Sequence, residues 1–138
     1  VNKGETAAEN RNSVHLVGTK KLSSELHELC LATNTTAGFD LEWDQESLFL
    51  RSDHANFAKQ GVPIAFFFTG LHADYHKVSD TPDKIHYEKL LGIATWVYDL
   101  AFELATQDGR PRIDPELWAA FDGKAKKQPV APMRDGDK

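Results

Sequence analysis

The chain has 138 residues, of which 41% are hydrophobic and 27% are charged, and its formal net charge is −5 at pH 7. This is the length of one domain and the composition of a folded globular protein, which excludes an intrinsically disordered chain. The negative charge argues against nucleic acid or an anionic membrane as partner, and no apolar run approaches the roughly 20 residues of a membrane helix.

The first elements that the sequence predicts are a strand, a helix and a second strand. Residues 14–18 (VHLVG) are a short apolar run that glycine ends, which indicates a strand. Ser23 or Ser24 can cap a helix that should end near Asn34. The apolar positions at helical spacing are Leu22, Leu26, Leu29 and Cys30. Residues 39–43 (FDLEW) alternate between apolar and polar, as a half-buried strand does.

Cys30 is the only cysteine of the chain. It therefore excludes an internal disulfide bond and a zinc site built from cysteines. Because it falls on the apolar side of the helix, we expect a buried and unreactive thiol.

The middle of the chain predicts a short helix and an apolar strand. Ser52 or Asp53 can cap a helix that runs to about Gln60, and Gly61 can end it in the left-handed conformation. Residues 62–68 (VPIAFFF) are apolar without alternation, which is typical of an interior strand covered on both faces. Three strands would leave such a sheet with unprotected edges. We therefore expect further strands from upstream sequence or from another subunit.

The clearest element is a helix at residues 87–106. Asp83 is a candidate cap upstream of it, and Gly109 and Pro111 stop it. Its apolar stripe is predicted to be Leu90, Ala94, Val97, Ala101 and Leu104, widened by Leu91, Ile93, Tyr98 and Leu100. Residues 114–116 (DPE) resemble the cap, first-turn proline and acid of a last short helix.

The resulting order β-α-β-α-β-α-α predicts an α/β fold with a helix–sheet–helix layering. No internal repeat interrupts it. We assign residues 1–123 to one domain and residues 124–138 to a flexible polar tail.

Ionisable residues gather directly after the apolar strand, where ligands bind in open α/β sheets. They are His72, Asp74, Tyr75, His76, Asp80 and Asp83. His72 and His76 have the spacing H-x-x-x-H, but in a loop this is weak evidence for a metal, because loop histidines are usually polar surface. Tyr75 can donate a hydrogen bond to a developing oxyanion, or it can simply pack at the end of the strand.

Two further candidates precede the short helix. Asp53 is either the cap of that helix or a residue that supports a metal site or contacts substrate, and His54 is either a surface residue or its partner in that role. The other histidines, His15, His27 and His86, receive no role. The sequence contains no G-x-S-x-G elbow, P-loop or dinucleotide fingerprint, which disfavours serine hydrolases and nucleotide enzymes.

The segment SDHANFAKQGVPIAFFFTGLHADYHKVSDTPDKIHYEKL resembles the C-terminal part of the catalytic domain of the M28 zinc aminopeptidases (clan MH, the bacterial leucine aminopeptidase group). The shared elements are Ser-Asp-His, Gly-Val-Pro, an apolar strand, Thr-Gly, His-x-Asp-Tyr-His and Asp-x-x-Asp-x-Ile. The resemblance covers roughly residues 13–105. It implies a mixed sheet between helices and a pair of metal ions, usually zinc.

In the site that this resemblance implies, His76 is a metal ligand and Tyr75 helps to polarise the scissile carbonyl. The residues expected to support the site or bind substrate are Asp53, His54, His72 and Asp74. The family's other ligands and its glutamate base should precede Val1. A catalytic zinc site needs about three protein ligands, so we expect the chain to be inactive without an N-terminal half or another copy.

The resemblance implies an exopeptidase that removes N-terminal residues from peptides, and a secreted or periplasmic location. Two alternatives share the fold. One is a relative of the glutaminyl-cyclase or carboxypeptidase type, and the other is a binding module without metals.

Overall fold

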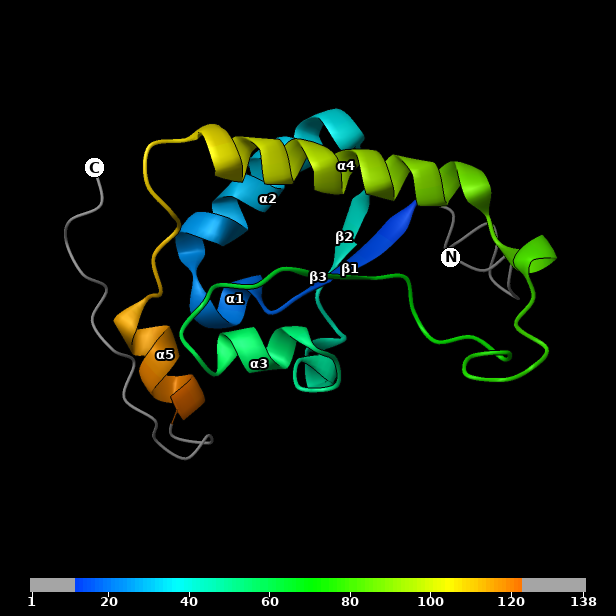
Figure 1. Cartoon of the computed structure of the whole chain (residues 1–138), viewed down its shortest axis with the longest axis horizontal. Coiled ribbons are helices and arrows are strands. Elements are labelled where there is room, and N and C mark those ends of the chain that lie inside the picture. The colour runs from blue at the N-terminus through cyan, green and yellow to red at the C-terminus, as the bar shows by residue number, and fades with distance from the viewer. Residues whose placement is uncertain (1–11, 123–138) are drawn as a thin grey trace.

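The computed structural model describes residues 12–122 (Figure 1). Its strands β1 (Ser13–Val17), β2 (Asp40–Glu42) and β3 (Phe66–Phe68) form one sheet in the order β2-β1-β3. β1 pairs in parallel with β2 and antiparallel with β3, so the sheet is mixed. The sheet and its helices confirm the α/β fold.

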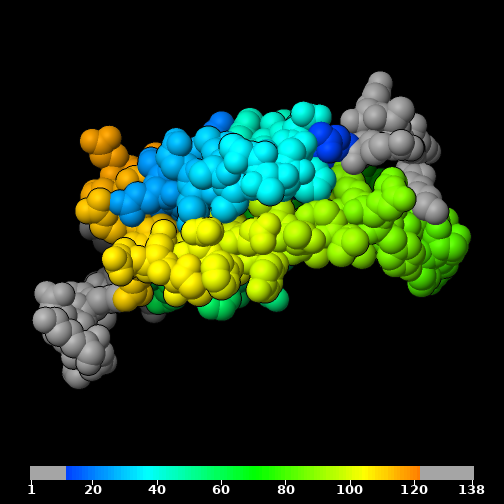
Figure 2. All heavy atoms as spheres, turned by 90° about the horizontal axis from the view of Figure 1, so that it is seen from above, coloured from blue at the N-terminus to red at the C-terminus, as the bar shows by residue number. Residues whose placement is uncertain are grey.

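Helices lie on both faces of this sheet, as the predicted helix–sheet–helix layering requires. The helices are α1 (Thr19–Leu22), α2 (Ser24–Ala37), α3 (His54–Ala58), α4 (Tyr87–Thr106) and α5 (Pro115–Asp122), with 3-10 turns η1 (Glu46–Leu48) and η2 (Pro82–Lys84). α2 and α4 run side by side over one face, and α3 lies on the other side of the strands (Figures 1 and 2). No helix in the described part of the chain is long and apolar enough to cross a membrane.

The central strand β1 organises the core, because all five of its residues are buried. Alternation along a strand sends neighbouring side chains to opposite faces. Leu16 accordingly packs with Leu26 of α2 and Leu100 of α4, whereas Val17 packs with Phe49 and Ala58 on the opposite side.

Helix α2 is capped as predicted and runs slightly further. Ser23 Oγ accepts a hydrogen bond from Leu26 N at 3.1 Å, and Gly38 ends the helix with a φ of 72°. The helix therefore continues to Ala37, three residues beyond the expected end at Asn34. Glycine at this position satisfies the left-handed cap without steric cost.

The predicted face of α4 is only partly right, because Ile93 and Leu100 from the edge of the predicted stripe are buried but its centre is exposed. Its buried apolar residues are Ile93, Trp96 and Leu100, whereas Leu90 and Val97 are 43% and 38% exposed. The helix is apolar around much of its circumference, so the spacing alone does not select the face. The predicted cap, Asp83, is wrong. The N-cap of the helix is His86, whose ring accepts from Lys89 N at 3.2 Å.

Strand β3 lies at the edge of the described sheet rather than in its interior, where the sequence had placed it. The apolar run is explained by packing on both faces. Ile64 belongs to the core cluster around Val17, while Ala65 and Phe67 pack against the cluster around Leu16. The polar tail predicted at residues 124–138 and most of the N-terminal loop lie outside the described residues.

Candidate functional site

The loop that follows β3 has an unusual backbone. It carries four of the six residues assigned to the predicted site, and the other two, Asp53 and His54, lie at the start of α3. His76 has a φ of 59°, and no other non-glycine residue among residues 12–122 has a positive φ. Side chains with a Cβ rarely adopt this conformation, and such strain persists only where surrounding contacts enforce it. The loop therefore holds His76 in a fixed and costly conformation.

Three aromatic rings of this loop lie against one another. The rings of Tyr75 and His76 stack with centroids 4.0 Å apart and an angle of 16°. His72 meets the Tyr75 ring edge-on at 5.9 Å. Tyr75 and His76 are both exposed, so the phenol and the imidazole stand next to each other on the surface of the described part.

Asp74 holds the loop closed. Its two carboxylate oxygens accept from Ser79 Oγ at 2.6 Å and from Lys84 Nζ at 2.7 Å. Lys84 also donates to Ser79 O at 2.6 Å. The hydrogen bond from Lys84, followed by that from Ser79, lowers the pKa of Asp74. The carboxylate thus stays charged and ties the loop to η2.

His54 and Asp53 lie apart from these contacts, at the start of α3. His54 Nε2 is 2.6 Å from Phe49 O, to which the protonated nitrogen donates. Its ring stacks on Phe66 of β3 at 4.5 Å, so His54 joins α3 to the sheet. Asp53 occupies the N-cap position, but its side chain makes no capping hydrogen bond. The capping role predicted for this carboxylate is therefore wrong.

The family model described as Peptidase family M28 matches residues 5–101, most of the chain. The chain belongs to peptidase family M28. This identifies it as a metal-dependent peptidase, a hydrolase. The matched part includes all three strands and most of α4, whereas α5 (Pro115–Asp122) lies beyond it. No curated protein and no solved structure gave a match.

A metal centre needs several donor groups that lie close together. Among residues 12–122, the one group of at least three potential metal ligands whose donor atoms lie together is His15, Glu42 and Asp44. His76 is not part of it. A catalytic zinc site takes about three protein ligands. Residues 12–122 therefore do not hold a catalytic metal ion at His76 by themselves.

The cluster formed by His15, Glu42 and Asp44 could not be predicted from the sequence. His15 is 27 residues from Glu42, and it looked like one polar residue within a strand. Only the pairing of β1 with β2 brings these residues together. Knowledge of that register is the signal that would have revealed them.

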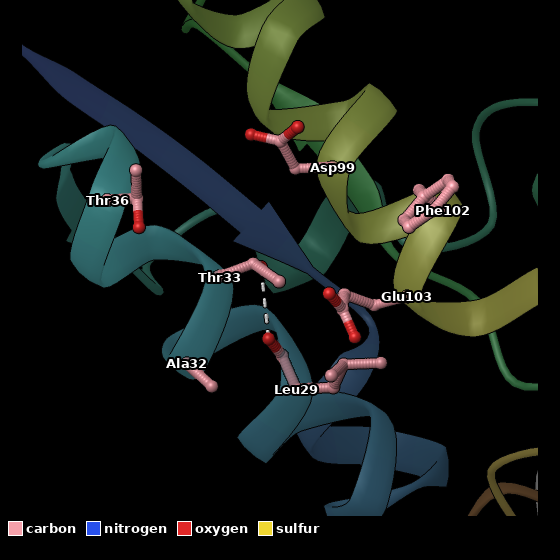
Figure 3. A pocket seen from close by; sticks show the side chains of 7 residues that line it. All are labelled: Leu29, Ala32, Thr33, Thr36, Asp99, Phe102 and Glu103. Atoms are coloured by element: carbon pink, nitrogen blue, oxygen red, sulfur yellow. Dashed lines mark hydrogen bonds between the residues drawn. The ribbon is translucent and has the colours of Figure 1, made fainter. Parts of the chain in front are cut away.

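Two surface cavities lie away from the candidate residues. One, of about 370 Å³, lies between α2 and α4, where Glu103 of α4 points toward Thr33 of α2 and Asp99 lines the same opening (Figure 3). The other, of about 460 Å³, is lined by residues of α1, η1 and α5 together with Lys59. None of the six predicted site residues lines either cavity.

Proposed function

We propose that this chain contributes the histidine-bearing loop of a dinuclear zinc centre in an M28 exopeptidase of the aminopeptidase kind. The observation that carries the proposal is the conformation of His76. The histidine that the family motif makes a metal ligand is also the described non-glycine residue with a left-handed backbone. Strained residues of this kind gather at functional sites, at a cost of about 1–3 kcal/mol each.

The contacts of the loop support this role for His76. Asp74 is bound by Ser79 and Lys84 on one side of the loop, which leaves the exposed imidazole of His76 as the group that can meet a partner. A histidine held rigidly loses little entropy when it binds a ligand. The remaining donors would come from polypeptide N-terminal to Val1 or from another copy of the chain.

Tyr75 is placed to act beside that donor. Its ring stacks on His76, so a group bound near the imidazole lies within reach of the phenol. A hydroxyl that donates to a developing oxyanion contributes transition-state stabilisation. The substrate that fits this proposal is a peptide with a free α-amino group, whose scissile carbonyl is the one next to its N-terminal residue.

The test compares the full-length protein with its His76→Ala variant. Lys77→Ala, a change on the same exposed loop, is the control. Zinc content by mass spectrometry of the metal and hydrolysis of aminoacyl anilides are measured together. We expect His76→Ala to lose both metal and hydrolysis, and Lys77→Ala to keep both. Unchanged zinc and turnover in His76→Ala would refute the assignment of the ligand.

A second variant separates the role of the phenol from that of the metal. Tyr75→Phe should retain zinc and lower kcat by about 10²–10³-fold, which is the range for one oxyanion donor. N-acetylated substrates should react much more slowly than free amines. Activity on C-terminal residues or cyclisation of N-terminal glutamine would instead favour the two related enzyme types, and bound peptide without turnover would favour a binding module.

A further inference from the structure

A second group of ligand atoms lies on the sheet itself. The parallel register of β1 and β2 places His15 directly opposite Glu42. Asp44 follows two residues later, in the turn after β2, and its carboxylate contacts the same imidazole. The cluster lies on the side opposite to α2 and α4, because the neighbours of His15, Val14 and Leu16, pack against those helices.

The distances in this cluster are close to those between ligand atoms around a single metal ion. His15 Nδ1 lies 2.8 Å from Asp44 Oδ1 and 3.4 Å from Glu42 Oε2. The three donor atoms all lie within 4.8 Å of one another. Two ligand atoms that are each about 2.1 Å from an ion lie about 3.0 Å apart at a right angle and about 3.4 Å apart at the tetrahedral angle. The 3.4 Å distance to Glu42 equals the tetrahedral value, whereas the 2.8 Å distance to Asp44 is slightly shorter than the right-angle value, because a hydrogen bond joins these two atoms.

The cluster combines one buried side chain with two that are exposed to water. The His15 side chain is 8% exposed, whereas the side chains of Glu42 and Asp44 are 45% and 62% exposed. The Phe68 ring lies 5.9 Å from the imidazole and helps to fix it. An ion would therefore be held by a rigid nitrogen on one side and by two carboxylates on the other, with room for water as further ligands.

The charges near the cluster also favour a cation. Hydrogen bonds from Gln45 and then from His15 lower the pKa of Asp44, so its carboxylate is charged at neutral pH. Burial lowers the pKa of Lys89, and the charge of Glu42 acts in the opposite direction. The cluster thus brings two carboxylates together, with one ammonium group, that of Lys89, nearby.

We propose that His15, Glu42 and Asp44 form a binding site for a divalent first-row transition metal such as zinc, separate from the site of His76. One imidazole nitrogen and two carboxylate oxygens suit zinc, manganese or cobalt, whereas calcium and magnesium prefer oxygen alone. The competing explanation is an ion pair between His15 and Asp44 with no affinity for metals. Under that explanation the chain binds no metal at this place, so Glu42→Gln should have no effect on zinc affinity.

The experiment measures zinc binding to the metal-stripped full chain by calorimetry in the His76→Ala background. In this background the proposed enzyme site cannot contribute. We expect about one equivalent of zinc to bind, and the additional changes Glu42→Gln and Asp44→Asn to weaken the affinity at least tenfold. The control is Asp40→Asn, an exposed carboxylate of β2 that lies outside the cluster and should leave the affinity unchanged.

A local measurement checks that the ion reaches the cluster. The imidazole NMR signals of His15 should shift during the zinc titration. They should not shift in the double variant, which carries Glu42→Gln and Asp44→Asn in the same His76→Ala background. Absence of binding in the His76→Ala background, or equal binding by the double variant, would overturn the proposal. The proposed enzyme site is tested separately, by comparing the zinc content and the turnover of His76→Ala with those of the parent chain.

Discussion

Lys84 Nζ lies 2.7 Å from Asp74 Oδ2 and fastens the loop after β3 to the turn before α4. The same carboxylate accepts from Ser79 Oγ across the loop. One acidic side chain therefore ties together residues that are five and ten positions apart, and His76 lies inside the segment that it closes.

Replacing Asp74 by alanine should release this loop without unfolding the protein. The pair is on the surface, where ion pairs contribute little to global stability, so we expect the melting temperature to change little. Amide hydrogen exchange in residues 75–80 should become faster. Lys77→Ala, which leaves the contacts of Asp74 in place, is the control. Equal protection of the loop in both variants would contradict the role of Asp74.

The same contact predicts how the loop responds to acid. Its partners lower the pKa of Asp74 below the ordinary value of about 3.9. The stabilisation is therefore fully present above the ordinary pKa, and it is lost as the pH falls through the lowered value in the folded protein. The protection factors of the loop amides, which are corrected for the intrinsic effect of pH on exchange, should decrease below about pH 4 in the parent chain but not in Asp74→Ala.

Two leucines of α4 test which face of that helix the core covers. Leu100 is 4% exposed and Leu91 is 69% exposed. Leu100→Ala should lower the free energy of unfolding by about 2–5 kcal/mol, because it leaves a cavity among packed side chains. Leu91→Ala should change it by no more than about 0.5 kcal/mol. Urea denaturation of both variants measures the difference, and similar losses would place the core on the other face.

The sequence predicted most elements of the fold because their local signals agree. Ser23 and Gly38 mark the ends of α2, and residues 87–106 repeat apolar residues over five turns. The face of α4 could be predicted only in part, since apolar residues occupy nearly all sides of it. The hydrogen-bond partner of Asp114 could not be predicted from the sequence either. Asp114 Oδ2 accepts from Ser24 N at 2.6 Å and so satisfies the start of α2, which lies 90 residues away.

The candidate site could be predicted only where its residues are close in sequence. His72, Asp74, Tyr75 and His76 were found because a single loop carries them. The left-handed backbone of His76 was not foreseen, because its neighbours in sequence give no sign of it. The cluster around His15 depends on strand register, which a single sequence does not specify when its strands are three to five residues long.

Gly18 connects β1 to α1 at a place where a side chain has no room. Its φ is 95°, and a Cβ atom there would collide with Ile64 Cδ1 and lie 2.8 Å from Phe49 Cε2. Gly18→Ala should therefore destabilise the fold by about 1–3 kcal/mol through overpacking, in addition to backbone strain of about 1–2 kcal/mol. Gly38→Ala is the matched control, because its φ is 72° but nothing lies within 4 Å. It should show the strain alone, and an equal loss in both variants would contradict the clash at Gly18.

The thiol of Cys30 should be unreactive until the protein unfolds. Burial among Leu16, Leu26 and Leu100 raises its pKa to about 12, so roughly one thiol in ten thousand is ionised at pH 8. Only the thiolate reacts with iodoacetamide. We expect no labelling of the native chain over an hour and one label per chain in concentrated urea, counted by intact mass. Because Cys30 is the only cysteine, every label that is counted reports on this thiol. Rapid labelling under native conditions would show that α2 does not pack on β1 as described.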